Sequence, residues 1–108
     1  MDARTKKLYE MKAEVFAALG HPIRLAVVDF LRDGEQCVCD IAAHVGAERS
    51  NVSRHLAVML RAGVLEHRKD GLRMLYRLRT PCVVEFMGCV TRVLREQMAA
   101  NNAALQRL

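Results

Sequence analysis

The chain has no tryptophan, and aromatic residues make up only 5% of its 108 residues. Proteins that bind single-stranded nucleic acids stack bases on aromatic rings, so duplex DNA is the better expected partner for this basic chain. No apolar run approaches the ~18 residues of a membrane helix. Residues 1–7 lead into a charged amphipathic pattern and not into a signal-peptide core. We therefore expect a cytoplasmic protein with no membrane partner.

Common catalytic patterns are also absent. The six glycines are scattered and form no phosphate-binding loop, and the four cysteines include no Cys-x-x-Cys pair. The sequence also shows no recognisable Ser/His/Asp catalytic triad. The sequence predicts a protein that is not an enzyme and that has no small organic substrate.

The composition of the chain predicts one small basic domain. Hydrophobic residues make up 52% of the chain, and 17 Lys and Arg against 12 Asp and Glu give a net charge of +5. A chain of this length builds one hydrophobic core, and its charge favours an anionic partner. We expect a single domain over residues 1–108 with its core in about 5–95.

Apolar residues at helical spacing, interrupted by glycine and proline, predict five helices. The expected ranges are about 5–19, 22–31, 38–44, 48–61 and 81 to about 95 or beyond, with 101–108 fraying. Thr80 and Pro81 are expected to cap and open the last helix. Residues 64–68 and 73–79 have a strand pattern on either side of an Asp70-Gly71 turn, which predicts a tight hairpin.

This order of elements predicts a mainly α fold with a β-hairpin wing, the winged helix-turn-helix. The fourth helix would enter the major groove, where Arg, Asn and Ser side chains contact base edges and phosphates. Its candidate DNA contacts are Arg49, Ser50, Asn51, Ser53, Arg54 and His55. Around the hairpin turn, Arg68, Lys69 and Arg73 are expected to reach the backbone or the minor groove.

The first and last helices carry apolar stripes that a domain of ~100 residues cannot wholly cover. The stripe of the last helix includes Val83, Met87, Val90 and Leu94. We therefore expect a homodimer that associates through the first and last helices.

Four segments come in the order seen in one protein family: residues 21–25 (His-Pro-Ile-Arg-Leu), 37–41 (Cys-Val-Cys-Asp-Ile), 51–56 (Asn-Val-Ser-Arg-His-Leu) and 69–72 (Lys-Asp-Gly-Leu). Over about residues 5–95 the chain resembles the ArsR/SmtB family of metal-sensing winged-helix repressors. The resemblance implies a homodimer that occupies operator DNA and leaves it when an effector binds. The Cys-Val-Cys-Asp element is similar to that of the arsenic- and antimony-responsive branch.

Cys37 and Cys39 lie at the start of the third helix, where the helix dipole favours thiolate over thiol. Thiolates suit soft ions, so As(III) or Sb(III) is the favoured effector, with Pb(II), Cd(II) or Zn(II) as alternatives. Side chains two residues apart on a helix point about 200° apart, so binding to both thiols should distort the helix. Ala42 stands where related sequences have a third cysteine, which leaves Cys89, Cys82 or an outside thiol as the third ligand.

Several alternatives remain open from the sequence. The simpler interpretation of Cys82 and Cys89 is that they are core residues. The simpler interpretation of His21 is that it caps a helix or packs against a neighbour. No histidine follows His67, which argues against the last-helix zinc site that the resemblance to zinc sensors implies. The cysteines also fit a dithiol switch for oxidants or reactive sulfur on the same scaffold. A third possible class of protein is an interaction module that does not bind DNA.

Overall fold

The computed structural model describes all 108 residues, in five helices and a three-stranded sheet. The helices are α1 (Ala3–Leu19), α2 (Pro22–Leu31), α3 (Val38–Val45), α4 (Arg49–Arg61) and α5 (Cys82–Gln106). The strands are β1 (Gln36–Cys37), β2 (Leu65–Asp70) and β3 (Arg73–Leu78). None of the helices has the length and apolar character needed to cross a membrane. The order of elements is that of the predicted winged helix-turn-helix.

Local capping explains where the central helices begin and end. His21 has extended backbone, and its Nδ1 accepts a hydrogen bond of 3.1 Å from the Ile23 N–H, so it caps α2 as predicted. Pro22 fits the first position of the helix, which needs no N–H donor. Gly46 ends α3 in the left-handed region, at φ 69°. That turn lets α4 begin three residues later, at an angle to α3.

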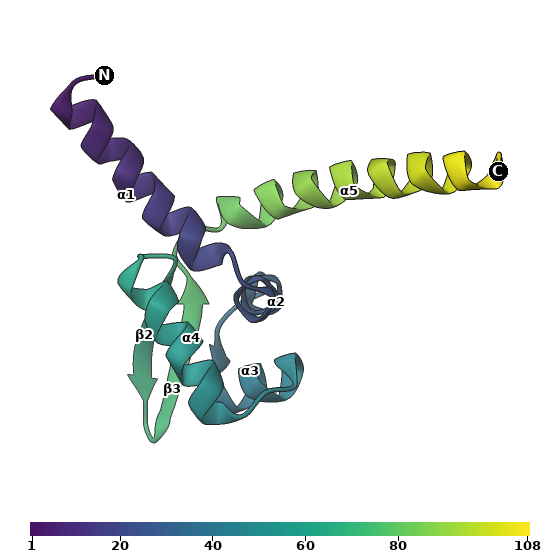
Figure 1. The fold of residues 1–108 in the computed structure, drawn as a ribbon. Coiled ribbons are helices and arrows are strands. Elements are labelled where there is room, and N and C mark those ends of the chain that lie inside the picture. Colours follow the sequence, from purple (N-terminus) through teal and green to yellow (C-terminus); the bar gives the residue numbers. More distant parts are fainter.

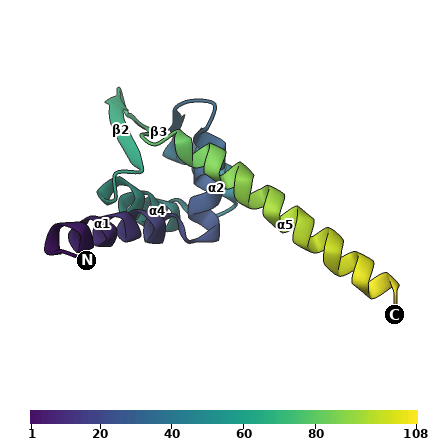
Figure 2. The same ribbon diagram turned by 90° about the horizontal axis from the view of Figure 1, so that it is seen from above.

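The core lies among α2, α3, α4 and the entry to the hairpin. Its fully buried side chains are Val27, Val28, Ile41, Val52, Leu56, Met59 and Val64. By contrast, α1 buries only Ala18 and Leu19, and α5 buries no residue. Figure 1 shows the consequence: α2, α3, α4 and the sheet form a body, while α1 and α5 extend away from it. The view from above in Figure 2 shows α5 beginning beside α2 and extending beyond every other element toward its C-terminal end.

The hairpin has the predicted turn and alternation. Asp70 pairs with Arg73 across a turn of Gly71 and Leu72, and Gly71 has φ 62°, which glycine adopts without strain. Strand β3 is central, because it pairs antiparallel with β2 on one side and with β1 on the other. The two-residue strand β1 was not predicted, since two residues are too few to show an alternating pattern.

Two predictions about the last helix are wrong. Residues 101–106 continue α5 and do not fray, because the good helix formers at 103–106 (Ala-Ala-Leu-Gln) follow the two asparagines and the segment lacks Gly and Pro. The Thr80 side chain does not cap the helix. Instead, the carbonyls of Thr80 and Pro81 accept the N–H groups of Val83 and Val84 at 3.0 and 3.1 Å.

We expect Leu56→Ala to lower the free energy of unfolding by about 2–5 kcal/mol, because it opens a cavity in the core. The matched control is Leu72→Ala at the hairpin turn, where the side chain is fully exposed and the loss should stay within about 0.5 kcal/mol. Urea denaturation measures both variants. Equal losses would show that the core does not lie where we place it.

Candidate DNA interface and thiol site

Helix α4 turns one apolar side inward and one polar side outward. Val52, Leu56 and Met59 are buried and fix the helix on α2 and α3. The opposite side exposes four of the predicted DNA contacts: Arg49, Ser50, Ser53 and Arg54. The 3.6-residue period of the helix therefore separates the groups that hold α4 from the groups that are free to contact another molecule.

Asn51 and Arg54 interact before any DNA is bound. Arg54 Nη2 donates a hydrogen bond of 3.3 Å to Asn51 Oδ1, one turn away on α4. Arginine can bind the two acceptors of guanine, and asparagine can pair with adenine. The contact holds two base-reading side chains together near the start of the helix.

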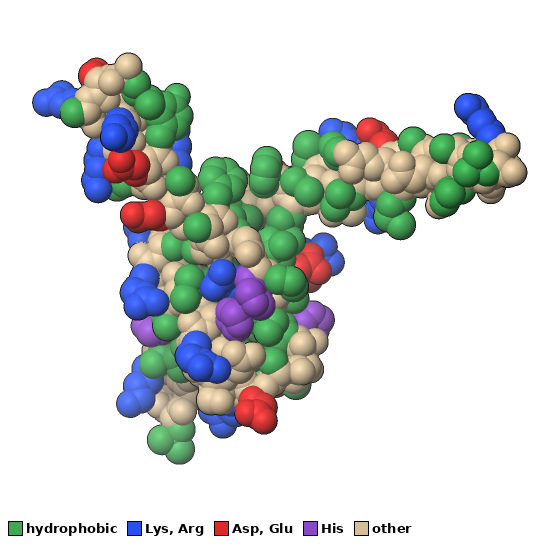
Figure 3. Space-filling model, in the orientation of Figure 1, with side chains coloured by type: hydrophobic (Ala, Val, Ile, Leu, Met, Phe, Trp, Pro, Cys, Tyr) green, Lys and Arg blue, Asp and Glu red, His purple; other side chains and the backbone are tan.

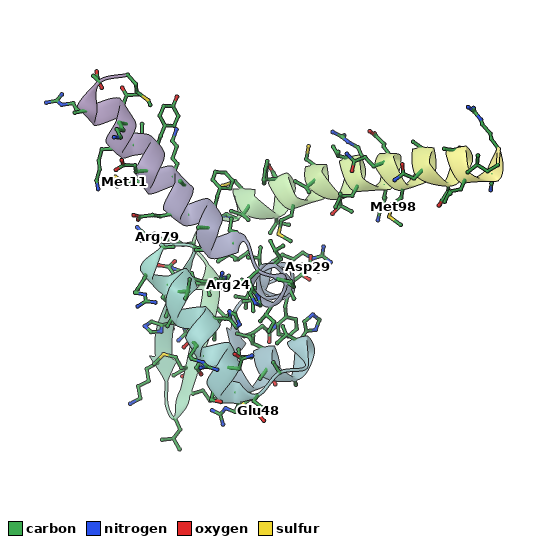
Figure 4. All side chains as sticks on the ribbon, in the orientation of Figure 1. Met11, Arg24, Asp29, Glu48, Arg79 and Met98 are labelled. Atoms are coloured by element: carbon green, nitrogen blue, oxygen red, sulfur yellow. The ribbon has the colours of Figure 1, made fainter.

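His55 lies differently from the other predicted contacts. Its ring is half-buried, and its centroid is 4.3 Å from that of His21 at the start of α2. Burial lowers the pKa of His55, and the nearby His21, Arg24 and Arg54 lower it further. Figure 3 shows histidine side chains beside Lys and Arg on this face, and Figure 4 places Arg24 between α2 and α4. His55 thus contacts α2 as well as facing outward.

The wing arginines are held by acidic and thiol groups near β1. Arg68 Nε donates to Glu35 Oε2 at 2.9 Å, and this hydrogen bond raises the pKa of Arg68. The pKa of Arg73 is raised mainly because its guanidinium faces the Cys37 thiol, with smaller effects of Asp40 and Asp70. Lys69, between them on the hairpin, is exposed and forms no ion pair.

Cys37 and Cys39 lie in different environments. Cys37 ends β1 and occupies the position before the first turn of α3, with extended backbone and a side chain only 7% exposed. Cys39 lies in the first turn of α3 and is exposed. Both thiols lie at the start of α3 as predicted, but Cys37 is the N-cap residue with extended backbone, so the angle of about 200° between two helical side chains does not apply to this pair. A shared ion still requires movement, since one thiol is buried and the other faces solvent.

Cys82 and Cys89 are exposed in the single chain, contrary to the expectation that they are core residues. They were expected inside because Cys is among the most buried residue types, but α5 leaves the body after its first turns. Arg92 Nη2 donates to Cys89 Sγ at 3.8 Å. Nowhere in the chain do three His, Cys, Asp or Glu side chains lie close enough to hold a metal ion. The donor set of Cys37 and Cys39 fits a thiophilic ion by chemistry but lacks a third ligand.

Residues 21–67, from the cap of α2 to strand β2, match the model of the bacterial regulatory protein arsR family. An uncharacterized HTH-type transcriptional regulator of Mycobacterium tuberculosis is 34% identical over 105 residues, covering 96% of this chain and 92% of that protein. The chain belongs to the ArsR family. This ArsR-family protein is accordingly a DNA-binding transcriptional regulator, and its relatives are regulators and not enzymes, as predicted.

Two further similarities concern assembly and effector. The solution structure of a homodimeric winged helix-turn-helix DNA-binding domain from Mycobacterium bovis, a possible ArsR-family transcriptional regulator, matches with TM-score 0.79 and 30% identity. It covers 91% of this chain and 91% of that one. The arsenical resistance operon repressor of Escherichia coli is 38% identical over 66 residues, which cover 60% of this chain and 56% of that repressor.

Two contributors to the site were not predicted from the sequence. Glu35 precedes a strand that the sequence did not reveal, so its contact with Arg68 had no visible signal. Arg24 shares the His-Pro-Ile-Arg segment with His21, but its position against α4 depends on how α2 and α4 pack.

The pKa of His55 predicts a pH dependence of stability. In the unfolded chain His55 takes up a proton near pH 6.5, its ordinary pKa, whereas in the folded protein the pKa is lower. The contribution of neutral His55 to the free energy of unfolding is therefore complete above about pH 6.5 and is lost as the pH falls below that value. We expect the urea midpoint to be lower at pH 5.5 than at pH 7.5, and His55→Gln to reduce this difference.

The matched control for that measurement is His44→Gln, which replaces an exposed histidine of α3. The control should keep the wild-type difference between the two pH values. If His55→Gln also keeps it, burial of His55 does not govern acid stability.

Proposed function

We propose that this protein is a homodimeric repressor that binds operator DNA and is released when As(III) or Sb(III) binds Cys37 and Cys39. The observation that carries the proposal is the position of these thiols at the junction of β1 and α3. There they adjoin both α3, which supports α4, and the sheet of the wing. Pb(II), Cd(II) and Zn(II) are the alternative ions to test.

DNA binding is assigned to the exposed side of α4 and to the wing. Arg49, Ser50, Asn51, Ser53 and Arg54 are the proposed major-groove contacts, with His55 at their inner edge. Arg68, Lys69 and Arg73 are the proposed contacts with the backbone or the minor groove. The net charge of +5 supports this assignment, because basic side chains that neutralise phosphates drive association with DNA.

We expect Arg54→Ala to cost about 1–3 kcal/mol on operator DNA if Arg54 contacts a guanine, and much less on random DNA. The matched control is Arg61→Ala at the other end of α4, which should change binding to both DNAs alike. Equal losses on operator and random DNA for Arg54→Ala would leave α4 without a base-reading role. Fluorescence anisotropy at fixed salt measures these affinities.

The uncovered faces of α1 and α5 support dimerisation. Val90 is 42% exposed and Met98 65% exposed. Phe16, Leu25, Phe86, Val90 and Leu94 contribute to an apolar groove of about 270 Å³ between α1, α2 and α5. The radius of gyration is 17.2 Å, against about 13 Å for a compact chain of this size. A second copy packed on α1 and α5 would cover this surface, and the homodimeric relative from Mycobacterium bovis favours that arrangement.

We expect Val90→Asp to dissociate the dimer, because it places a charge in the apolar interface. Ala99→Asp is the matched control, since nine residues along a helix place the same new charge on the opposite side of α5. Sedimentation equilibrium at micromolar concentration should show a monomer for the first variant and a dimer for the second. A stable wild-type monomer would contradict the proposed assembly.

Thiolate chemistry supports the effector. As(III) and Sb(III) are soft ions that thiolates bind strongly, and the arsenical repressor of Escherichia coli is among the relatives. Cys37 and Cys39 would supply two ligands, while the third would come from Cys89, Cys82 or a thiol outside the chain. Reversing a 99:1 preference for the DNA-bound form requires about 5.5 kcal/mol of differential binding. Two or three bonds between the ion and sulfur are strong enough to provide this difference in binding free energy.

We expect Cys37→Ser and Cys39→Ser each to keep operator affinity and to abolish release by arsenite, because neither residue is a proposed DNA contact. Cys82→Ser and Cys89→Ser serve as controls and should weaken release only for the one that supplies the third ligand. Release of the Cys37→Ser/Cys39→Ser double variant at the wild-type arsenite concentration would place the sensor elsewhere.

The second candidate function is a redox or reactive-sulfur sensor on the same scaffold. The observation that favours it is the exposed Cys89 thiol, which an oxidant can reach, with Arg92 Nη2 at 3.8 Å from its Sγ. Intact mass after treatment separates the two functions. Arsenite adducts support the first, whereas disulfide or persulfide products that dissociate the operator complex support the second.

A further inference from the structure

The segment that carries Cys37 is a strand of the wing sheet. Gln36 pairs with Tyr76 and Cys37 pairs with Leu75, while the other side of β3 pairs with β2. Strand β3 therefore connects the thiol segment to the rest of the hairpin. A change in the backbone at Cys37 acts directly on the strand that carries Arg73.

An ion pair adds one side-chain contact between this segment and a wing arginine. Glu35 binds Arg68 at 2.9 Å. Leu75 lies opposite Cys37, and Arg73 lies two residues further along β3 and so on the same face of the sheet. The effect of Cys37 on Arg73 noted above agrees with this register. Because exposed ion pairs are individually weak, the backbone pairing is the main connection and the ion pair positions Arg68.

Effector binding disturbs this connection. The Cys37 side chain is 7% exposed and Cys39 is exposed, so both sulfur atoms can bind one ion only if Cys37 turns outward. That rotation changes the backbone at the end of β1, where Cys37 pairs with Leu75. We expect the pairing of Cys37 with Leu75 to be lost with this movement, and with it the placement of the Cys37 thiol on the same face as Arg73.

We propose that residues 35–37 control the wing as well as α4: in the free protein they hold Arg68 and Arg73 in place, and effector binding at Cys37 withdraws the wing from DNA. This inference rests on the proposed function and specifies how ion binding at the thiol site lowers the affinity for DNA. Release then has two parts, the loss of base contacts from α4 and the loss of phosphate contacts from the hairpin.

Lys69 provides the test, because it is a proposed phosphate contact that touches neither Glu35 nor Cys37. Operator affinity is measured against salt concentration for wild type and Lys69→Ala, with and without arsenite, beginning at low salt where the residual binding is measurable. Without arsenite, Lys69→Ala should reduce the steepness of the log–log salt dependence by about 0.9, the value of one phosphate contact. With arsenite, wild type and Lys69→Ala should have the same slope.

A reduction by Lys69→Ala of the same size with and without arsenite would overturn the proposal, because the wing would still contact DNA in the loaded protein. No reduction in either condition would also overturn it, since the wing would then make no phosphate contact. Intact mass separates these failures from failure of the effector itself. If arsenite adds no mass, the proposed function is wrong and this inference falls with it.

A matched pair of variants tests the part assigned to Glu35. Glu35→Gln removes the ion pair that joins residues 35–37 to Arg68 of β2, whereas Glu66→Gln removes an ion pair within the hairpin, between Glu66 of β2 and Arg77 of β3. Arsenite should change the salt slope less in Glu35→Gln than in wild type, and to the full wild-type extent in Glu66→Gln. Equal behaviour of the two variants would contradict the role of Glu35.

Discussion

The backbone pairing of Cys37 with Leu75 is the contact on which the functional arrangement depends. It makes the residue before α3 a member of the wing sheet, and the Cys37 side chain there is only 7% exposed. The helix that supports α4 and the strand that carries the wing arginines therefore meet at one residue. A ligand that moves this residue acts on both proposed DNA-contacting elements at once.

Because the buried body is small, most of α1 and all of α5 lie outside the core. The buried side chains come from α2, α3, α4 and the start of the hairpin, with Cys37 of β1 and the last turn of α1 added. Helix α5 is 25 residues long but buries none of them, although its apolar stripe continues to the C-terminal end. An isolated helix gains most of its stability from packing. The proposed second subunit would thus have a structural role in addition to doubling the DNA-binding surface.

Most of the fold was predictable because its signals are local. Proline at residue 22, the glycines at the turns and the 3.6-residue period of α4 each act within a few residues, and they located the helices and the hairpin. The polar side of α4 followed from the same period. Strand β1, the ion pair of Glu35 with Arg68 and the contact of His55 with His21 are tertiary, and no local pattern encodes them. Cys82 and Cys89 were misplaced because an apolar stripe does not reveal whether its own chain or another covers it.

Coupling between thiols and DNA is reciprocal by thermodynamic necessity. If arsenite lowers operator affinity by a given factor, operator DNA must lower arsenite affinity by the same factor. The most direct test of the account is therefore the arsenite dissociation constant of the wild-type protein, measured by calorimetry with and without saturating operator DNA. The account predicts weaker arsenite binding to the DNA complex, by the factor seen for DNA release. Equal arsenite affinity in the two states would show that the thiols and the DNA-binding surface are not coupled.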